Sequence, residues 1–240
     1  MNKRFYIDSL DNARILDGPE FHHLAHVLRL NVGDEIDLVD GMGTLASARI
    51  DEIHKKKAVL SILRSEKHSK PSPILIAAIA FLRMEKLDWA IEKATELGAE
   101  SIILFPADLS EKKQLSDHQI EHLRNISIAA MKQCFRLYLP AITVADSLEN
   151  VLQRDAYALF GDLDPQAPVL ANVPDYSPIL FITGPEKGFS KGEEDFLRQK
   201  AKGVRLHANV LRAETAPIVA LSILSRNLQC DYNHRTHCLP

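Results

Sequence analysis

The sequence predicts an α/β protein in two parts, a small β-rich module and a larger domain built on a mostly parallel sheet. Short β-like runs and glycine turns dominate residues 1–70, whereas strand-like and helix-like segments alternate from Ile74 onward. Such alternation implies a parallel sheet with helices on both faces. Residues 67–73 contain Pro71 and Pro73 and are typical of a linker. We therefore expect one domain at 1–70 and a second at 71–240.

The N-terminal module is expected to form a small β-barrel with one inserted helix. Its strand-like runs are residues 13–16, 35–39, 45–50 and 58–63. The helix is expected at residues 20–30, because Pro19 suits a first helical turn and Leu24, Val27 and Leu28 recur at helical spacing.

The second domain is expected to alternate strands with amphipathic helices. Apolar runs predict strands at residues 74–80, 101–105, 141–144, 157–160, 179–183 and 203–206. Helical spacing predicts helices at residues 84–97, 118–135, 148–153, 191–200 and 216–229. Gly98 is a candidate helix C-cap, and Ser190 with Glu193 has the spacing of a capping box.

The composition is that of an ordinary globular protein. A formal net charge of -3 does not favour strong non-specific binding to nucleic acid, so RNA contacts would need local basic patches. The spacing of Cys134, Cys230 and Cys238 fits neither a zinc site nor a disulfide framework, and we expect free thiols and no metal. Neither a signal peptide nor a membrane span is predicted, which favours a cytoplasmic protein.

Two short motifs follow predicted strands and precede predicted helices. The first is Gly184-Pro185-Glu186-Lys187-Gly188-Phe189, and the second is Leu211-Arg212-Ala213-Glu214-Thr215-Ala216. In open α/β sheets ligands bind at the edge formed by the carboxyl ends of the strands, where such loops lie. We expect both loops to build one pocket.

The residue types in the first motif suit a ligand. Gly184 and Gly188 permit a close approach of the backbone, Pro185 stiffens the turn, and Glu186 can accept hydrogen bonds. The alternative is an ordinary strand-to-helix turn, where glycine and proline are common.

The second motif places a cation beside a helix start. Glu214 or Thr215 is a candidate N-cap, with Pro217 just inside the helix. Arg212 suits contacts with phosphate or carbonyl oxygens, and the alternative is a simply exposed arginine. Because a cation near a helix N-terminus is mildly unfavourable, the functional interpretation gains weight.

Other candidates lie on two helices and one basic cluster. Gln133 and Arg136 share a helix face that either holds a polar substrate or is a solvated helix end. His22 and His26 have metal-binding spacing but no evident third ligand, which favours a surface or RNA-facing helix. A further cluster is either a solvated turn or a footing for RNA, and its members are Lys55, Lys56, Lys57, Arg64, Lys67 and Lys70.

Five motifs, in order along the whole chain, resemble those of the ribosomal small-subunit methyltransferase E family. This family belongs to the SPOUT class and methylates a uridine of 16S rRNA at N3. The motifs are residues 26–29 with Gly33-Asp34, residues 92–98, residues 131–134 with Arg136 and Pro140, and the loops at Gly184 and Leu211. Each motif alone is weak, but five in the same order are specific.

The resemblance implies a PUA-like RNA-binding barrel, a SPOUT domain with a deep trefoil knot, and a homodimer. It also implies that S-adenosylmethionine is held by Phe160, Thr183, Gly184, Pro185, Glu186, Gly188, Leu206, Asn209, Leu211, Ala213 and Thr215. RNA of the small ribosomal subunit would meet Arg4, His22, Arg29, Lys112 and Gln133. Arg212 would stabilise the uridine anion that forms, with Arg136 of the partner subunit, and no metal is required. The group that takes the proton is not identified.

The sequence departs from the family pattern at a few positions. Lys187 and His207 stand where glycine is usual, Asn209 stands where arginine is frequent, and Lys112 replaces an arginine. Two alternatives to methylation stay open. One is a cofactor-binding factor that contacts ribosomal RNA but has lost catalysis. The other is a nucleotide-binding enzyme, although the commonest phosphate-loop patterns do not occur.

Overall fold

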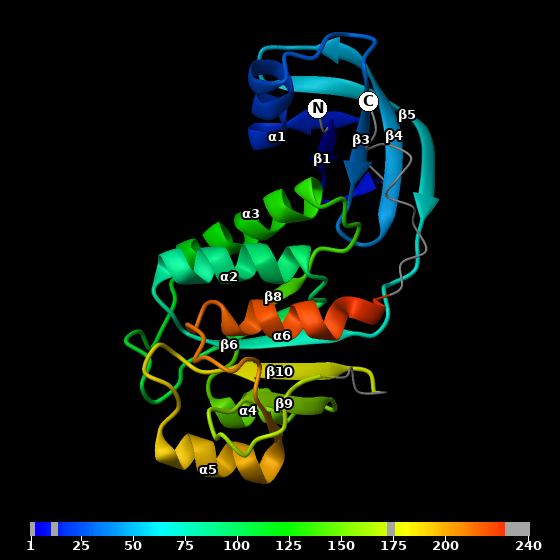
Figure 1. Cartoon of the computed structure of the whole chain (residues 1–240). Coiled ribbons are helices and arrows are strands. Elements are labelled where there is room, and N and C mark those ends of the chain that lie inside the picture. The colour runs from blue at the N-terminus through cyan, green and yellow to red at the C-terminus, as the bar shows by residue number, and fades with distance from the viewer. Residues whose placement is uncertain (1–2, 11–13, 172–175, 229–240) are drawn as a thin grey trace. The chain divides into compact units, whose positions relative to one another are not determined.

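The chain divides into two compact units, and each is described by itself. The computed structural model describes residues 3–10, 14–171 and 176–228 (Figure 1). One unit contains the described residues up to Lys70 together with Met131–Leu139, and the other contains Pro71–Ala130 and the described residues from Pro140 onward. The predicted class, a β module followed by a parallel α/β domain, is confirmed. Cys230 and Cys238 lie outside the described residues.

The first unit contains a curled five-stranded sheet. Its strands, in spatial order, are β1 (Arg4–Tyr6), β3 (Glu35–Val39), β4 (Thr44–Ile53), β5 (Lys57–Lys67) and β2 (Ile15–Asp17). β1 pairs with β3 in parallel, and the other pairings are antiparallel. Two register shifts in the β4–β5 ladder increase the local bend. Within the described residues β1 and β2 are the two edges, so the expected barrel is an open half-barrel.

The helix expected at residues 20–30 is wrong in its length and type. An α-helix, α1 (Gly18–His22), continues as a π-helical turn, η2 (His23–Val27). The helical path ends at Leu28, because Arg29 has a left-handed φ of 52°. Phe21 and Leu24 point into the core of the first unit, as the apolar spacing predicts.

The segment Met131–Leu139 packs in the first unit, whereas the sequence indicated either a face that holds a polar substrate or a solvated helix end there. Its apolar residues Met131 and Leu137 form a small core with Val39. The Gly43 N–H donates to the Leu137 carbonyl (2.8 Å), and the Leu139 N–H donates to the Gly41 carbonyl (2.8 Å). This ladder places the middle motif of the sequence beside the N-terminal sheet.

The second unit contains a six-stranded parallel sheet. Its strands, in spatial order, are β11 (Lys202–Val204), β9 (Tyr157–Gly161), β10 (Ile179–Thr183), β6 (Leu75–Ala80), β7 (Ser101–Phe105) and β8 (Ala141–Val144). Every pairing is parallel. β10 lies between β9 and β6 and is buried along its whole length, which explains its uninterrupted apolar sequence. The last strand is shorter than the expected 203–206.

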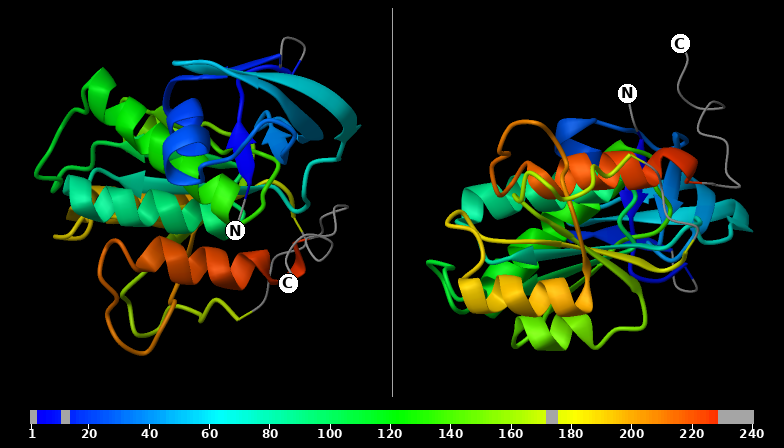
Figure 2. Two further views of the ribbon diagram at one scale, coloured as in Figure 1. Left: turned by 90° about the horizontal axis from the view of Figure 1, so that it is seen from above. Right: turned by 60° about the horizontal axis from the view of Figure 1, so that its bottom comes forward.

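Helices cover both faces of this sheet (Figure 2). One face packs against α2 (Met84–Glu96), α3 (Asp117–Gln133) and α6 (Ala216–Leu224), and the other packs against α4 (Leu148–Leu152) and α5 (Lys191–Lys200). Side chains along β6 alternate between the two faces of the sheet, and both faces are apolar, so helices can pack on each. Leu75, Ala77 and Ile79 face α2, α3 and α6, whereas Ile76 and Ala78 face α4 and α5. The trefoil knot stays a prediction.

The helix ends follow the expected signals in part. Ser190 caps α5 in the predicted capping box with Glu193, and Gly98 follows α2 with φ of 90°. α3 ends at Gln133 and α6 at Leu224, with a 3₁₀ turn η3 (Ser225–Asn227) after it. In the part of the chain that the structure describes, no helix combines the length and the hydropathy needed to cross a membrane.

Candidate functional site

Three neighbouring parallel strands of the second unit end at the rim of one cavity. β9 ends at Gly161, β10 at Thr183 and β11 at Val204, and all three residues line the cavity. Its volume is about 550 Å³, within the usual range of about 300–1,000 Å³ for small-molecule sites. The carboxyl edge of a parallel sheet is where such ligands bind.

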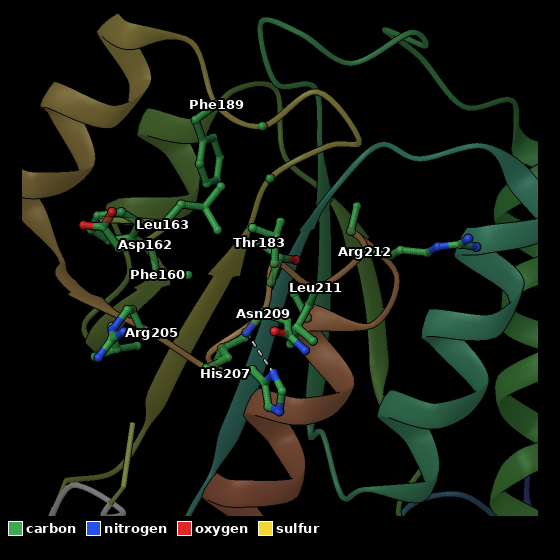
Figure 3. Close-up of a pocket in the computed structure, with 18 of the residues that line it drawn as sticks. Phe160, Asp162, Leu163, Thr183, Phe189, Arg205, His207, Asn209, Leu211 and Arg212 are labelled. Atoms are coloured by element: carbon green, nitrogen blue, oxygen red, sulfur yellow. Dashed lines mark hydrogen bonds between the residues drawn. The ribbon is translucent and has the colours of Figure 1, made fainter. Parts of the chain in front are cut away.

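The cavity gathers the residues that the sequence singled out (Figure 3). The predicted cofactor-binding residues that line it are Phe160, Thr183, Gly184, Pro185, Glu186, Gly188, Leu206, Asn209, Leu211 and Ala213. Arg212 also lines the cavity, whereas Thr215 lies outside the lining as the N-cap residue of α6. The prediction that both loops build one pocket is therefore confirmed, and ligand binding by these residues stays a prediction.

The cavity wall also contains residues that the sequence did not single out. Lys86 and Asp162 line it. The carboxylate of Asp162 is 9% exposed and accepts a hydrogen bond from Arg198 at 3.0 Å. Asp162 follows β9 directly, so the rule that polar residues at the carboxyl edge line a site could have found it.

The first loop is a tight turn between β10 and α5. The Gly188 N–H donates to the Pro185 carbonyl (2.9 Å), and Gly188 has a left-handed φ of 77°. An added Cβ at Gly184 would lie 3.1 Å from the ring of Phe189. The two glycines therefore serve different purposes, one in the backbone turn and one in the packing of the wall.

The second loop runs from β11 to α6 and is held at both ends. The Arg205 N–H donates to the Pro168 carbonyl (2.8 Å), and the Thr215 N–H donates to the Arg212 carbonyl (2.9 Å). Between them the Asn209 N–H donates to Nδ1 of His207 (3.0 Å), as Figure 3 shows. Thr215, one of the two predicted candidates, is the N-cap residue of α6, but its side chain makes no capping hydrogen bond.

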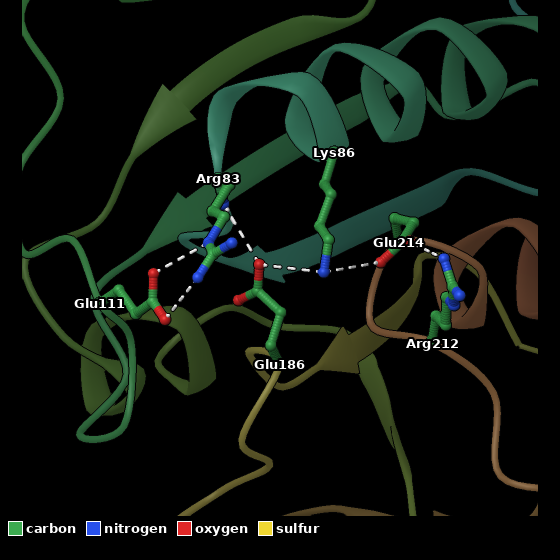
Figure 4. A network of polar contacts seen from close by, with 6 residues as sticks. All are labelled: Arg83, Lys86, Glu111, Glu186, Arg212 and Glu214. Carbon is green, nitrogen blue, oxygen red and sulfur yellow. Dashed lines mark hydrogen bonds and ion pairs between the residues drawn. The ribbon is translucent and has the colours of Figure 1, made fainter.

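A chain of charged side chains joins the two loops to the start of α2 (Figure 4). Nζ of Lys86 lies 3.3 Å from Glu186 Oε1 and 3.5 Å from Glu214 Oε2. The Arg83 N–H donates to Glu186 Oε1 (3.3 Å), and the Arg83 guanidinium donates to both carboxylate oxygens of Glu111 (3.0 and 3.1 Å). Both pocket loops therefore share contacts with the first turn of α2.

These contacts set the charge state of the carboxylates. Burial raises the pKa of Glu186, but hydrogen bonds from its own N–H and the Arg83 N–H, together with the ammonium of Lys86, outweigh burial and hold that pKa below 4.5. The hydrogen bonds from Arg83 hold the pKa of Glu111 below its ordinary value, and the same contact raises the pKa of Arg83. Both carboxylates are charged at neutral pH.

Arg212 lies at the rim of the cavity. Its side chain is 84% exposed, and its Nη1 is 4.0 Å from Glu214 Oε1. Glu214 in turn is only 12% exposed. The cation therefore has freedom to meet a substrate, while a buried carboxylate lies beside it.

The remaining predicted residues are not among those that line this cavity. His22, Arg29 and Gln133 are exposed, and Lys112 is half-buried. Arg4 is 5% exposed, because its guanidinium lies over the Phe135 ring (4.7 Å) and near Asp37 (3.8 Å). Packing within the first unit accounts for this arginine, and its contact with RNA stays a prediction.

Two further predicted groups have clear environments. Arg136 lies in the first unit and is 5% exposed. The His22 and His26 rings lie 5.0 Å apart, as the helical spacing predicted. Among the described residues no three potential metal ligands come together.

Comparison with known proteins agrees with this architecture. Residues 68–225 match the RNA methyltransferase domain family, and residues 16–63 match the RNA methyltransferase PUA domain family. The expected PUA-like character of the first module is therefore confirmed.

Individual relatives extend the match over nearly the whole chain. The ribosomal RNA small subunit methyltransferase E of Rickettsia conorii is 32% identical over 91% of this chain and 93% of that protein. The crystal structure of a probable rRNA-methyltransferase from Porphyromonas gingivalis is 28% identical, covers 91% of this chain and 95% of its own, and has a TM-score of 0.81. A putative methyltransferase of Legionella pneumophila, solved in complex with the cofactor SAM, shares the fold at 24% identity, with a TM-score of 0.84 over 93% of this chain and 97% of its own.

The family match covers both the β module and the domain that carries the cavity, and a relative above 30% identity spans almost the full length of both proteins. The chain belongs to the ribosomal RNA small subunit methyltransferase E family.

Proposed function

We propose that this chain transfers a methyl group from S-adenosylmethionine to N3 of a uridine in 16S rRNA of the small ribosomal subunit. The observation that carries the proposal is the single cavity built by the Gly184 and Leu211 loops at the carboxyl edge of the sheet. Its family membership supports the reaction class, and the cofactor named for the Legionella protein supports the ligand.

The residues of the cavity fit this cofactor. Phe160, Leu206 and Leu211 offer apolar surface for an adenine ring, and Glu186 offers a charged acceptor for hydroxyl or ammonium groups. Gly184 leaves the backbone accessible at the end of β10. When bound, the cofactor supplies an electrophilic methyl group on a sulfonium centre.

The protein's contribution to the chemistry is alignment and charge. N3 lies on the Watson–Crick edge of uridine, so the base must be unpaired to enter a pocket. Its proton must leave, and the ring then carries negative charge. Arg212 carries a guanidinium group and is exposed at the cavity rim, which suits it to stabilise that charge.

The RNA contacts and the homodimer are proposed from the resemblance to the family. His22, Arg29 and Gln133 are exposed on the first unit and available to RNA. We propose a homodimer in which Arg136 of the partner subunit assists Arg212, and the burial of Arg136 in this chain means that such a role would require its side chain to become accessible. The proposed place of action is the cytoplasm.

Transfer of labelled methyl groups to unmodified small ribosomal subunits tests the proposal. Label in 3-methyluridine is the expected product, identified by nucleoside analysis. Arg212→Ala should bind the cofactor normally but lose most of its turnover, about 100-fold or more, as for other groups that stabilise developing charge. Arg124→Ala is the control, because Arg124 is a partly exposed arginine on α3 that also lies near a carboxylate, at 3.8 Å. Unchanged turnover in Arg212→Ala would remove its catalytic role. Cofactor binding without any label would favour a factor that has lost catalysis.

A further inference from the structure

Lys86 occupies a special place in the second unit, because its ammonium contacts carboxylates from both pocket loops. Nζ lies 3.3 Å from Glu186 in the first loop and 3.5 Å from Glu214 in the second (Figure 4). Lys86 itself belongs to the first turn of α2, a helix anchored in the core through Leu87 and Ala90. A rigid element therefore presents one cation to two loops that are distant in sequence.

The two carboxylates differ in their other support. Glu186 also accepts a hydrogen bond from the Arg83 N–H, so it keeps a second anchor on α2. Glu214 has less support from neighbouring groups. Its Oε2 is buried and accepts no hydrogen bond from any residue that the structure describes. Its other oxygen lies 4.0 Å from the exposed guanidinium of Arg212. Of the two cations beside Glu214, Lys86 is therefore the nearer one.

Removal of the Lys86 charge would have a physical consequence for both loops. Two carboxylates that now share one ammonium would face each other without it, and like charges repel. A buried carboxylate that loses its cation must also regain water. Both effects push Glu214, and with it the 205–215 loop, away from the start of α2.

We propose that Lys86 is a positioning residue that holds the two pocket loops in their binding geometry and, through Glu214, keeps Arg212 at the rim. The step from loop geometry to methyl transfer rests on the proposed function. The step from Lys86 to loop geometry rests only on the contacts described above.

The decisive measurement is amide hydrogen–deuterium exchange of the cofactor-free protein, comparing Lys86→Met with wild type. Exchange in peptides covering residues 184–189 and 205–215 should rise by about tenfold, the factor that corresponds to the loss of one charge-assisted contact. Lys93→Met is the matched control. Lys93 lies on the same helix, has similar exposure, and also contacts two carboxylates, at 2.6 and 2.8 Å. It should leave exchange in both loops unchanged.

Two further variants identify the contacts. Lys86→Arg keeps the charge and should restore slow exchange in part. Glu214→Gln removes only one of the two carboxylates, so it should speed exchange at 205–215 and spare 184–189, where Glu186 keeps Lys86 and the Arg83 N–H. If Lys86→Met does not fold, the Glu214→Gln variant takes its place in the exchange experiment. Equal exchange in Lys86→Met, Lys93→Met and wild type would overturn the proposal, as would unchanged exchange at 205–215 in Glu214→Gln.

Calorimetric titration then links the loops to function. Affinity of Lys86→Met for S-adenosylmethionine should fall by about tenfold, because loop order must be restored on binding, and kcat should fall further as Arg212 loses its position. Faster loop exchange with unchanged affinity would overturn the binding part of the proposal. If wild type itself did not bind the cofactor, the proposed function would fail, while the exchange data would still decide the role of Lys86.

Discussion

The two glycines of the first pocket loop should resist replacement for different reasons. Gly188 has φ of 77°, and an added Cβ would meet no atom within 4 Å. Its replacement by alanine therefore costs only backbone strain, about 1–2 kcal/mol for an L-residue in the left-handed region. That loss would reduce the ratio of folded to unfolded protein by about 5–30-fold.

Gly184 has no such strain, because its φ is not positive. Its Cβ would instead lie 3.1–3.3 Å from the ring of Phe189, so the ring must move or the core is overpacked. Phe189→Leu removes part of that ring. It should recover some of the stability lost in Gly184→Ala and none of that lost in Gly188→Ala, which a double-mutant cycle can measure.

Urea unfolding, followed by circular dichroism, gives the free energies. Gly192→Ala is the control, because Gly192 lies in α5 without positive φ and its Cβ would meet only Ser190 Oγ, at 3.9 Å. It should stabilise the protein by up to about 1 kcal/mol, the helix propensity of alanine over glycine. A Gly188→Ala protein as stable as wild type would refute the strain argument, and so would rescue of Gly188→Ala by Phe189→Leu.

Two further predictions concern polar groups. The contacts of Glu186 lower its pKa below 4.5, so the charged carboxylate stabilises the folded state above that pH and loses this effect as the pH falls through the lowered pKa. Glu186→Gln should therefore unfold at a lower urea concentration than wild type near pH 7, and this difference in urea midpoint should close in acid. A difference in midpoint that does not change with pH would contradict the prediction. Thr95 and Ser127 are fully buried, and their hydroxyl oxygens lie 2.9 Å apart between α2 and α3. Thr95→Val should cost about 1–3 kcal/mol by leaving Ser127 without this partner, whereas the double variant with Ser127→Ala should regain most of it in thermal unfolding, and additive losses would argue against the pair.

The sequence located the pocket because its evidence was local. Gly184 and Leu211 each follow an apolar run and precede a helix, and the edge rule for parallel sheets brings such loops together without any knowledge of packing. The strand boundaries at 101–105, 141–144 and 179–183 were also correct. The first and last of these are buried apolar runs, whereas 141–144 is a largely exposed edge strand of the sheet.

Contacts between distant segments were outside the reach of the sequence. Lys86 has helical spacing and an ordinary exposed-face pattern, and nothing local marks it as the partner of Glu186 and Glu214. The packing of residues 131–139 against the N-terminal sheet had one usable signal. Gly43 belongs to the glycine turns expected in residues 1–70, but an added Cβ there would lie 2.3 Å from the Tyr138 ring, so the glycine is required by a close contact.

The errors in the first unit have a backbone cause. Leu24, Val27 and Leu28 predicted a regular helix, but the chain widens to a π-helical turn at His23–Val27. Hydrophobic spacing does not separate these two helix types over so short a stretch. β1 was missed because Arg4–Tyr6 is a strand of three residues, too short for an alternating pattern to be visible.

Lys187 and His207 stand where the family pattern has glycine, and the backbone conformation of the pocket loops accommodates both. Glycine is required where φ is positive, and among the non-glycine residues described only Arg29 and Phe135 have positive φ. His207 and Lys187 therefore occupy positions where a side chain costs no strain. His207 adds a contact that glycine cannot make, because its ring accepts the Asn209 N–H within the second loop. Lys187 is exposed, and its charge adds to the larger effect of Arg83 in lowering the pKa of Glu111. Side chains thus take over part of the loop geometry in this chain, and the positive φ that the first loop does need remains at Gly188.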